Sequence, residues 1–176
     1  LFAKTALFPL HLWLPPAHAG APAAASAVLS AVVVKGAAFL VVRLWFDVMP
    51  GMLGGAGAQL FGALGAAAII FGSVVALQQQ RLKLLIAYST VAQIGYLFLI
   101  FPLALDASAQ LQGSGALTGG IVQAISHATA KAAMFMAAGL IYAALGHDRI
   151  AELGGVARAL PMTIFAFALG GVSLIG

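Results

Sequence analysis

Three lysines of this sequence lie inside long apolar runs, where a charged side chain opposes burial in lipid. Lys4, Lys35 and Lys131 occupy the runs at 1–13, 21–45 and 116–145. A lysine at the centre of a membrane helix disfavours insertion by roughly 2.5–3.5 kcal/mol. These runs contain no Asp or Glu that could neutralise the lysines. A lysine kept at such a position calls for a structural or chemical role.

Three roles are open for these lysines. A lysine near a helix end can extend its ammonium group to the membrane surface, and this role suits Lys4 best. Lys35 and Lys131 lie ten or more residues from the ends of their runs. A lysine side chain of ~6 Å covers only about four residues at 1.5 Å per residue, so these two cannot reach the surface. They either bind a backbone carbonyl or face a hydrated interior, where they carry or control the movement of charge.

A histidine strengthens the case for proton chemistry at Lys131. His127 precedes Lys131 by four residues, so the two side chains share one helix face. Burial favours the neutral form of a lysine, which can then load and release a proton as nearby charges change. Imidazole titrates near neutral pH and relays protons through either ring nitrogen. A packed core histidine is an equally open alternative for the pair alone, and the other two lysines in apolar runs, Lys4 and Lys35, add weight to proton transfer.

Pro9 predicts a break in the first membrane helix. It follows Lys4 by five residues, and a proline inside a helix removes a backbone hydrogen bond. Broken helices mark ion pathways in many transporters, because the freed backbone groups must face protein or water. His11 and His18 flank Trp13 beyond the break; they either lie at the interface or line the path by which protons enter. The four histidines lie far apart in the sequence, and no carboxylate or Cys joins them at ligand spacing, so no metal site is expected.

The composition is that of an integral membrane protein. Of the 176 residues, 63% are hydrophobic and only 7% are charged, whereas a soluble domain carries about 25% charged residues. Six continuously apolar segments are long enough, wholly or in part, to cross a bilayer. They are 1–13, 21–45, 56–77, 82–101, 116–145 and 160–176. We therefore predict an all-α polytopic transmembrane helix bundle of about five or six helices. Because both ends lie in apolar runs, residues 1–176 are expected to be a single transmembrane domain, an internal fragment of a longer subunit.

The distribution of charge predicts an orientation and excludes one class of partner. The net charge of +4 comes from singly scattered basic residues, so no nucleic acid partner is expected. Four basic residues fall on one side of the predicted topology, and Arg43 alone falls on the other. The four are Arg81, Lys83, Arg149 and Arg158. By the positive-inside rule, their side is cytoplasmic.

The sequence carries no sign of a redox centre. It has no Cys, so it cannot form disulfides or thiolate-held clusters. It also lacks a glycine-rich dinucleotide fingerprint, and no cofactor is expected. Whether the chain belongs to an enzyme is left open, since any oxidoreductase activity would reside in partner proteins.

Three motifs are distributed along the chain. They are KTALFPLHLWLP at 4–15, followed by Ala17-His18, Ala21-Pro22 and Ser26; LKLLIAYSTVAQIGY at 82–96; and SHATAKAAMF at 126–135, closed by His147-Asp148, Ile150 and Leu153-Gly154-Gly155. With them, the chain resembles the antiporter-like membrane subunits. That family comprises the large proton-pumping subunits of respiratory complex I, the A-type and D-type components of the Mrp cation/proton antiporters, and relatives in membrane-bound hydrogenases. Arg81 departs from the acidic residue that often precedes the second motif in the family.

The resemblance implies a role for each singled-out residue. Lys4 would lie beside the break in a discontinuous helix, and Lys35, His127 and Lys131 would belong to a row of titratable groups along the membrane midplane. The usual acidic partner of the first lysine would precede Leu1, and a further lysine would follow Gly176.

The resemblance also implies the function and its setting. The chain would translocate protons as a subunit of a NADH:quinone oxidoreductase-like complex or of an Mrp-type Na⁺/H⁺ antiporter, slightly closer to the D-type Mrp component. Its partners would be the lipid bilayer, other membrane subunits, and protons, with Na⁺ left open. Its location would be the bacterial inner (plasma) membrane. The alternatives are a structural membrane subunit without its own proton path and a transporter of neutral solutes.

Overall fold

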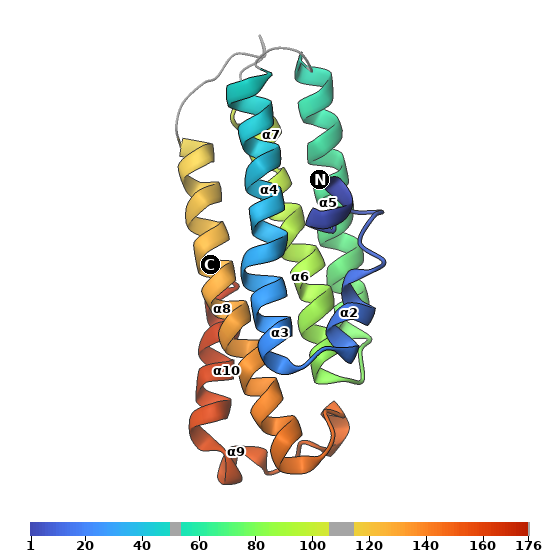
Figure 1. The fold of residues 1–176 in the computed structure, drawn as a ribbon, viewed down its shortest axis with the longest axis vertical. Helices are drawn as coiled ribbons and strands as arrows, with labels where there is room; N and C mark the ends of the chain where they lie inside the picture. The colour runs from blue at the N-terminus through green and yellow to red at the C-terminus, as the bar shows by residue number, and fades with distance from the viewer. Residues whose placement is uncertain (50–53, 106–114, 176) are drawn as a thin grey trace.

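The structure is a computed structural model that describes residues 1–49, 54–105 and 115–175. Long helices run side by side along one axis of the bundle (Figure 1). Four helical spans of the described residues are long and apolar enough to cross a membrane: Ala23–Val48, Gly54–Leu77, Leu82–Leu103 and Gly115–Leu145. The predicted all-α transmembrane bundle is therefore confirmed.

The described elements follow the predicted segments closely. The α-helices are α1 (Phe2–Thr5), α2 (Leu14–Gly20), α3 (Ala23–Val28), α4 (Val34–Arg43), α5 (Gly54–Leu77), α6 (Leu82–Phe98), α7 (Ile100–Leu103), α8 (Gly115–Leu145), α9 (Val156–Ala159) and α10 (Pro161–Ser173). Two π-helical turns, η1 (Leu29–Val33) and η2 (Leu44–Val48), continue the span that contains α3 and α4, and a 3₁₀ turn, η3 (Ile150–Glu152), follows α8.

Two details differ from the sequence prediction. Pro15 and Pro16, which fall between the predicted segments 1–13 and 21–45, form the first turn of α2. Proline is tolerated there because the first helical amides have no intrahelical partner. The second span also continues to Val48, so it includes Asp47, whose carboxylate pairs with Arg43 at 2.7 Å on an exposed face.

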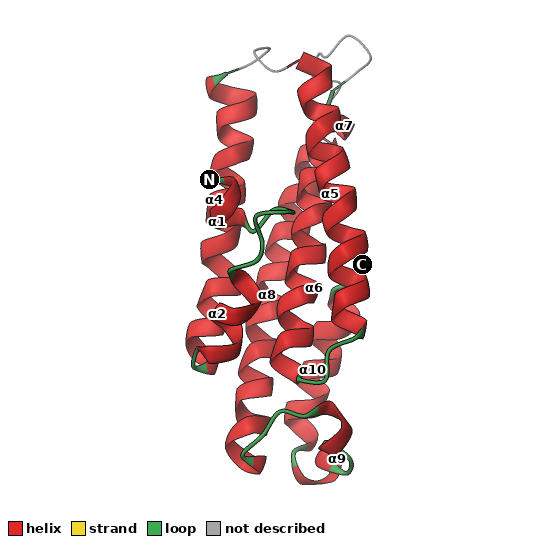
Figure 2. Ribbon diagram, turned by 90° about the vertical axis from the view of Figure 1, so that its right-hand side faces the viewer, coloured by secondary structure: helices red, strands yellow, loops and turns green. Residues whose placement is uncertain are grey.

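The first helix is broken as predicted. α1 ends at Thr5, and Ala6 takes a left-handed conformation with φ of 55°. Figure 2 shows α1 and α2 joined by a loop instead of a continuous helix. Pro9 lies within this loop, and the Trp13 indole reaches back across it to donate to the Ala3 carbonyl at 2.6 Å. Lys4 therefore lies in the last turn before the break.

Glycines bring α5 and α6 into close contact. A Cβ atom at Gly65 would lie 2.6 Å from the Gly95 carbonyl oxygen, and one at Gly72 would lie 2.6 Å from the Ala92 nitrogen. Small residues let helix backbones approach where lipid supplies no hydrophobic drive for association. α8, which carries Lys131, packs against α6 of this pair.

One end of the bundle is fastened by the loops that follow α5 and α8. The Leu82 amide donates to the Asp148 carbonyl at 2.8 Å, and the Ile150 amide donates to the Gln80 carbonyl at 2.9 Å. The Arg81 guanidinium adds an ion pair of 2.9 Å to the buried Asp148 carboxylate. These loops thus share one end, as predicted, and its cytoplasmic orientation stays a prediction.

Two apolar cores fill the bundle, and polar residues lie buried between its helices. One core gathers aromatic residues such as Trp45, Phe98 and Phe101, and the other packs Ile86 and Phe135 between α6 and α8. The buried polar or charged residues are Thr5, His11, His18, Ser26, Ser30, Lys35, Lys83, Thr90, His127, Lys131 and Asp148. Lys83, one of the four basic residues that fall on one side of the predicted topology, lies in the first turn of α6 and exposes only 8% of its surface.

Candidate functional site

Lys131 lies fully buried near the middle of α8. Its ammonium donates to the Ile86 carbonyl of α6 at 3.1 Å and also to the Ser89 hydroxyl. Both partners are neutral. These contacts occupy two of the three ammonium donors. Unlike a carboxylate, they do not fix Lys131 in the charged state.

Lys35 lies on a different span, Ala23–Val48, as the second residue of α4, and exposes 8% of its surface. Its ammonium donates to the carbonyl of Ser30, which belongs to the π-helical turn η1. Such turns interrupt the regular hydrogen-bond ladder and often occur at functional sites. The turn presents a backbone oxygen to the lysine from within the same helix.

Hydroxyl groups bridge the space between the two lysines. The Ser30 and Thr90 hydroxyls lie 3.2 Å apart, and Thr90 donates to the Ile86 carbonyl at 2.9 Å. The same carbonyl accepts from Lys131. A continuous set of polar contacts thus runs from Lys35 through Ser30, Thr90 and Ile86 to Lys131. Hydroxyls both donate and accept, whereas the carbonyls of Ser30 and Ile86 only accept, so proton passage along the whole set needs water at those two points.

Sequence reasoning missed Ser30, Ser89 and Thr90 as parts of this site. Ser89 and Thr90 fall within the second motif without a role, although two adjacent hydroxyls inside an apolar run are a usable signal. Ser30 precedes Lys35 by five residues. A separation of five residues matches no hydrogen bond of an α-helix, whereas a π-helical turn bonds residues that are five apart.

Two histidines lie near Lys131. His127 precedes it on α8, and His18, on α2, packs against α8 beyond it. His127 exposes 1% of its surface, and neither of its ring nitrogens finds a hydrogen-bond partner among the described residues. The His18 ring stacks on Phe135, with ring centroids 4.4 Å apart, and Phe135 follows Lys131 by four residues. No hydrogen bond joins His127 directly to Lys131 within the described ranges, although they share a face as predicted.

The charges of this group act on one another. Each of the four side chains carries a positive charge when protonated, and all four are buried: Lys35, Lys131, His18 and His127. No carboxylate is hydrogen-bonded to any of the four within residues 1–49, 54–105 and 115–175. Adding a proton to one member therefore disfavours a proton on the others, since like charges repel more strongly in a low-dielectric interior.

The remaining predicted residues lie apart from this group. Lys4 is exposed on α1. His11 is buried beyond the break between the rings of Phe8, at 5.5 Å, and Phe71, at 4.8 Å. The structure thus brings Lys35, His18, His127 and Lys131 together, but not Lys4 or His11.

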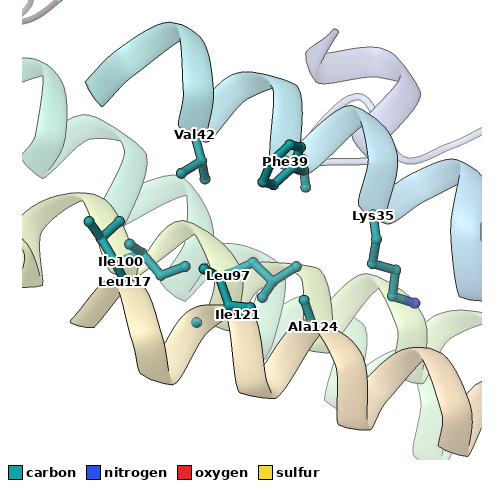
Figure 3. Close-up of a pocket in the computed structure, with 10 residues that line it drawn as sticks. Lys35, Phe39, Val42, Leu97, Ile100, Leu117, Ile121 and Ala124 are labelled. Atoms are coloured by element: carbon teal, nitrogen blue, oxygen red, sulfur yellow. The ribbon is translucent and has the colours of Figure 1, made fainter. Parts of the chain in front are cut away.

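An apolar cavity of about 70 Å³ lies beside Lys35. Figure 3 shows Lys35 at one end of it, with side chains of α4, α6 and α8 along the rest. Val42, Leu97 and Ile121 are among its lining residues. A cavity with so few polar partners stays dry, so it offers the Lys35 ammonium no route for water.

In the part of the chain that the structure describes, no three His, Cys, Asp or Glu side chains gather as metal ligands.

The comparison with known proteins covers the whole chain. Residues 1–176 match the family described as "NADH:quinone oxidoreductase/Mrp antiporter, TM". The chain belongs to this family. The resemblance drawn from the three motifs is thereby confirmed.

Relatives come from both branches of the NADH:quinone oxidoreductase/Mrp antiporter family. The chain is 37% identical over 180 residues to NADH-quinone oxidoreductase subunit N of Desulforudis audaxviator, covering 98% of the chain and 33% of the relative. It is 35% identical to NADH-quinone oxidoreductase subunit M of Rhodobacter capsulatus, again covering 98% of the chain and 33% of the relative. Among solved structures, the Mrp complex from Dietzia sp. DQ12-45-1b matches with a TM-score of 0.89 and 28% identity, over 99% of the chain and 31% of its counterpart.

The chain therefore spans about one third of the length of the relatives it matches. The names of these relatives describe them as a subunit of an oxidoreductase and as the structure of a complex.

Proposed function

We propose that this chain translocates protons across the membrane as part of a longer antiporter-like subunit. Its row of titratable groups is Lys4, Lys35, His127 and Lys131. The observation that carries the proposal is the pair of buried lysines, Lys35 and Lys131, joined through hydroxyl groups and held by neutral partners only. A lysine without a carboxylate partner can lose its proton without leaving a buried anion unpaired.

Each residue has a distinct part in the proposed transfer. Lys131 holds a proton while its ammonium contacts Ser89 and the Ile86 carbonyl. When Lys35 takes up a proton, repulsion drives the proton of Lys131 away, and the reverse holds on return. His127 accepts or supplies the proton through ring nitrogens that no protein group occupies in the described structure. Pro9 breaks the helix that carries Lys4, and His11 and His18 line the path by which protons enter.

The proposal extends to the kind of complex that contains the subunit. Relatives include subunits of NADH-quinone oxidoreductases and the structure of an Mrp complex. Either a NADH:quinone oxidoreductase-like complex or an Mrp-type Na⁺/H⁺ antiporter fits this chain, with the D-type Mrp component as the nearer antiporter branch. We place the subunit in the bacterial inner membrane, with protons, and Na⁺ in the antiporter case, as the transported ions.

One observation favours a second role. The contact of Lys131 with the Ile86 carbonyl ties α8 to α6, as expected for a lysine in a structural membrane subunit without its own proton path. Arginine would preserve such a contact, whereas a proton carrier cannot be replaced by arginine, because guanidinium stays charged at any relevant pH.

Replacement of Lys131 in the full-length subunit separates the two roles. Lys131→Met and Lys131→Arg should both assemble and both pump poorly in reconstituted vesicles. Thr129→Val is the matched control, because Thr129 lies exposed on the same helix and bonds only carbonyls of α8. Full proton transport by Lys131→Met, or normal transport by Lys131→Arg with failed assembly of Lys131→Met, would end the proposal in favour of the structural role.

A further inference from the structure

A polar cavity of about 350 Å³ opens at the end of the bundle where α2, α3, α6 and α8 meet. The proton path proposed above does not use it. Its lining includes Gly20, Ala21, Arg81, Lys83, Gly139 and Tyr142. Two of these residues are cations, and none is acidic.

Lys83 is the principal charge of the cavity. Its side chain is largely buried, and its ammonium donates to the Ala21 carbonyl at 3.2 Å. The ammonium also lies 5.4 Å from the centre of the Tyr142 ring, within the range of a cation–π contact. An ammonium has three donors. No other acceptor for it is found among the described residues, so donors remain for a ligand in the cavity.

Arg81 adds a second set of donors at the rim. Its Nε atom binds the Asp148 carboxylate at 2.9 Å, which balances its charge. A guanidinium has five N–H donors in a planar fork that matches the oxygens of a phosphate. Arg81 therefore contributes directed hydrogen bonds, while Lys83 contributes the net positive charge.

The cavity lies at the level where a bilayer has its head groups. α6 begins at Leu82 and α8 ends at Leu145, so Lys83 and Tyr142 are each within three residues of the end of a membrane-spanning helix. Tyrosine is enriched at this depth. Deeper on α8, Met136 exposes 46% of its surface. A ligand with a charged head and an apolar tail fits this succession of surfaces.

We propose that this cavity binds the phosphate group of an anionic phospholipid. Basic pockets between transmembrane helices are suited to such head groups. The phosphate oxygens accept from Lys83 and Arg81, and the acyl chains follow the outer face of α8. Gly20 leaves the space that the head group needs, because a Cβ atom there would meet nothing within 4 Å.

The test measures lipid binding to the purified full-length subunit in detergent. Dioctanoyl phosphatidylglycerol is titrated, and its apparent dissociation constant is read from the rise in melting temperature. Dioctanoyl phosphatidylcholine and inorganic phosphate are titrated in parallel. We expect phosphatidylglycerol to bind more tightly than either, and Lys83→Gln to weaken it about fivefold, as expected for one basic residue near the membrane surface.

Two controls keep the result decisive. Arg158→Gln removes an exposed cation outside the cavity, within α9, and should leave the dissociation constant unchanged. If Lys83→Gln fails to fold, Gly20→Asp and Gly20→Asn decide, because both fill the same space in the cavity and differ only in charge. The aspartate should weaken binding more than the asparagine does. Equal binding of phosphatidylcholine, equal protection by inorganic phosphate, or equal affinities of the Gly20 variants would overturn the proposal.

Discussion

The hydroxyl contact between Ser30 and Thr90 provides the sharpest test of the proton path. Thr90→Val keeps the shape of a fully buried side chain and removes only its hydroxyl. The change deletes a donor to the Ile86 carbonyl, which keeps Lys131 and Ser89 as donors. It also leaves the Ser30 hydroxyl without the 3.2 Å partner that it has in the described structure.

The expected loss of stability follows from these contacts. Hydrogen bonds between membrane helices contribute about 0.6 kcal/mol on average and at most about 1.7 kcal/mol. A buried hydroxyl left without a partner adds a penalty of about 1–3 kcal/mol, reduced where serine can bond a carbonyl of its own helix. We therefore expect Thr90→Val to destabilise the subunit by about 1–2 kcal/mol. Adding Ser30→Ala removes the unpaired hydroxyl and should bring stability back to within about 1 kcal/mol of the parent.

Transport should not recover with stability. If protons pass along the hydroxyls, both Thr90→Val and the double variant lose about tenfold or more in rate, which corresponds to ~1.4 kcal/mol in the barrier. The assay pairs unfolding of the full-length subunit in detergent with acidification of reconstituted vesicles. A double variant that regains both stability and transport would refute a relay through Ser30 and Thr90 and leave them a packing role.

Two further outcomes are expected from the structure. Gly72→Ala places a methyl group against the backbone of α6 and should lower the stability of the subunit by about 1–3 kcal/mol. Gly36→Ala is the control, because the new methyl group has open space around it, and it should not lower stability. Equal unfolding midpoints for the two variants would contradict the close packing of α5 on α6. Cysteines at Gln80 and Val48, near opposite ends of the bundle, should react with a membrane-impermeant reagent from opposite sides, Gln80 from the cytoplasm; labelling from one side alone would contradict the topology.

Segment positions were readable from the sequence because lipid imposes a simple requirement. A run of apolar residues bounded by glycine or glutamine predicted helices at 56–77 and 116–145, and the structure has Gly54–Leu77 and Gly115–Leu145. The break near Pro9 was readable for a similarly local reason, since proline lacks the amide that a helix needs. Lys35 and Lys131 were singled out because their cost in lipid can be judged from the sequence alone.

Contacts between distant residues could not be read in the same way. Ser30 and Thr90 are sixty positions apart, and no local pattern pairs them. Lys83 stands next to residues typical of a loop, yet the first turn of α6 carries it to the face of the Tyr142 ring. Such positions depend on how helices pack, which hydropathy and turn residues do not encode.

The π-helical turn η1 has a consequence for how relatives of this chain are compared. Such a turn holds one residue more than the α-helical turn it replaces. A relative with a single-residue deletion within Leu29–Val33 would keep the same hydropathy profile and the same span. Every side chain beyond the deletion would turn by about 100° around the helix axis relative to those before it. Lys35 and Ser30 could then no longer face α6 together. A one-residue gap at this point of an alignment would therefore indicate a relative that lacks the contacts of Ser30 with Thr90 and Lys35.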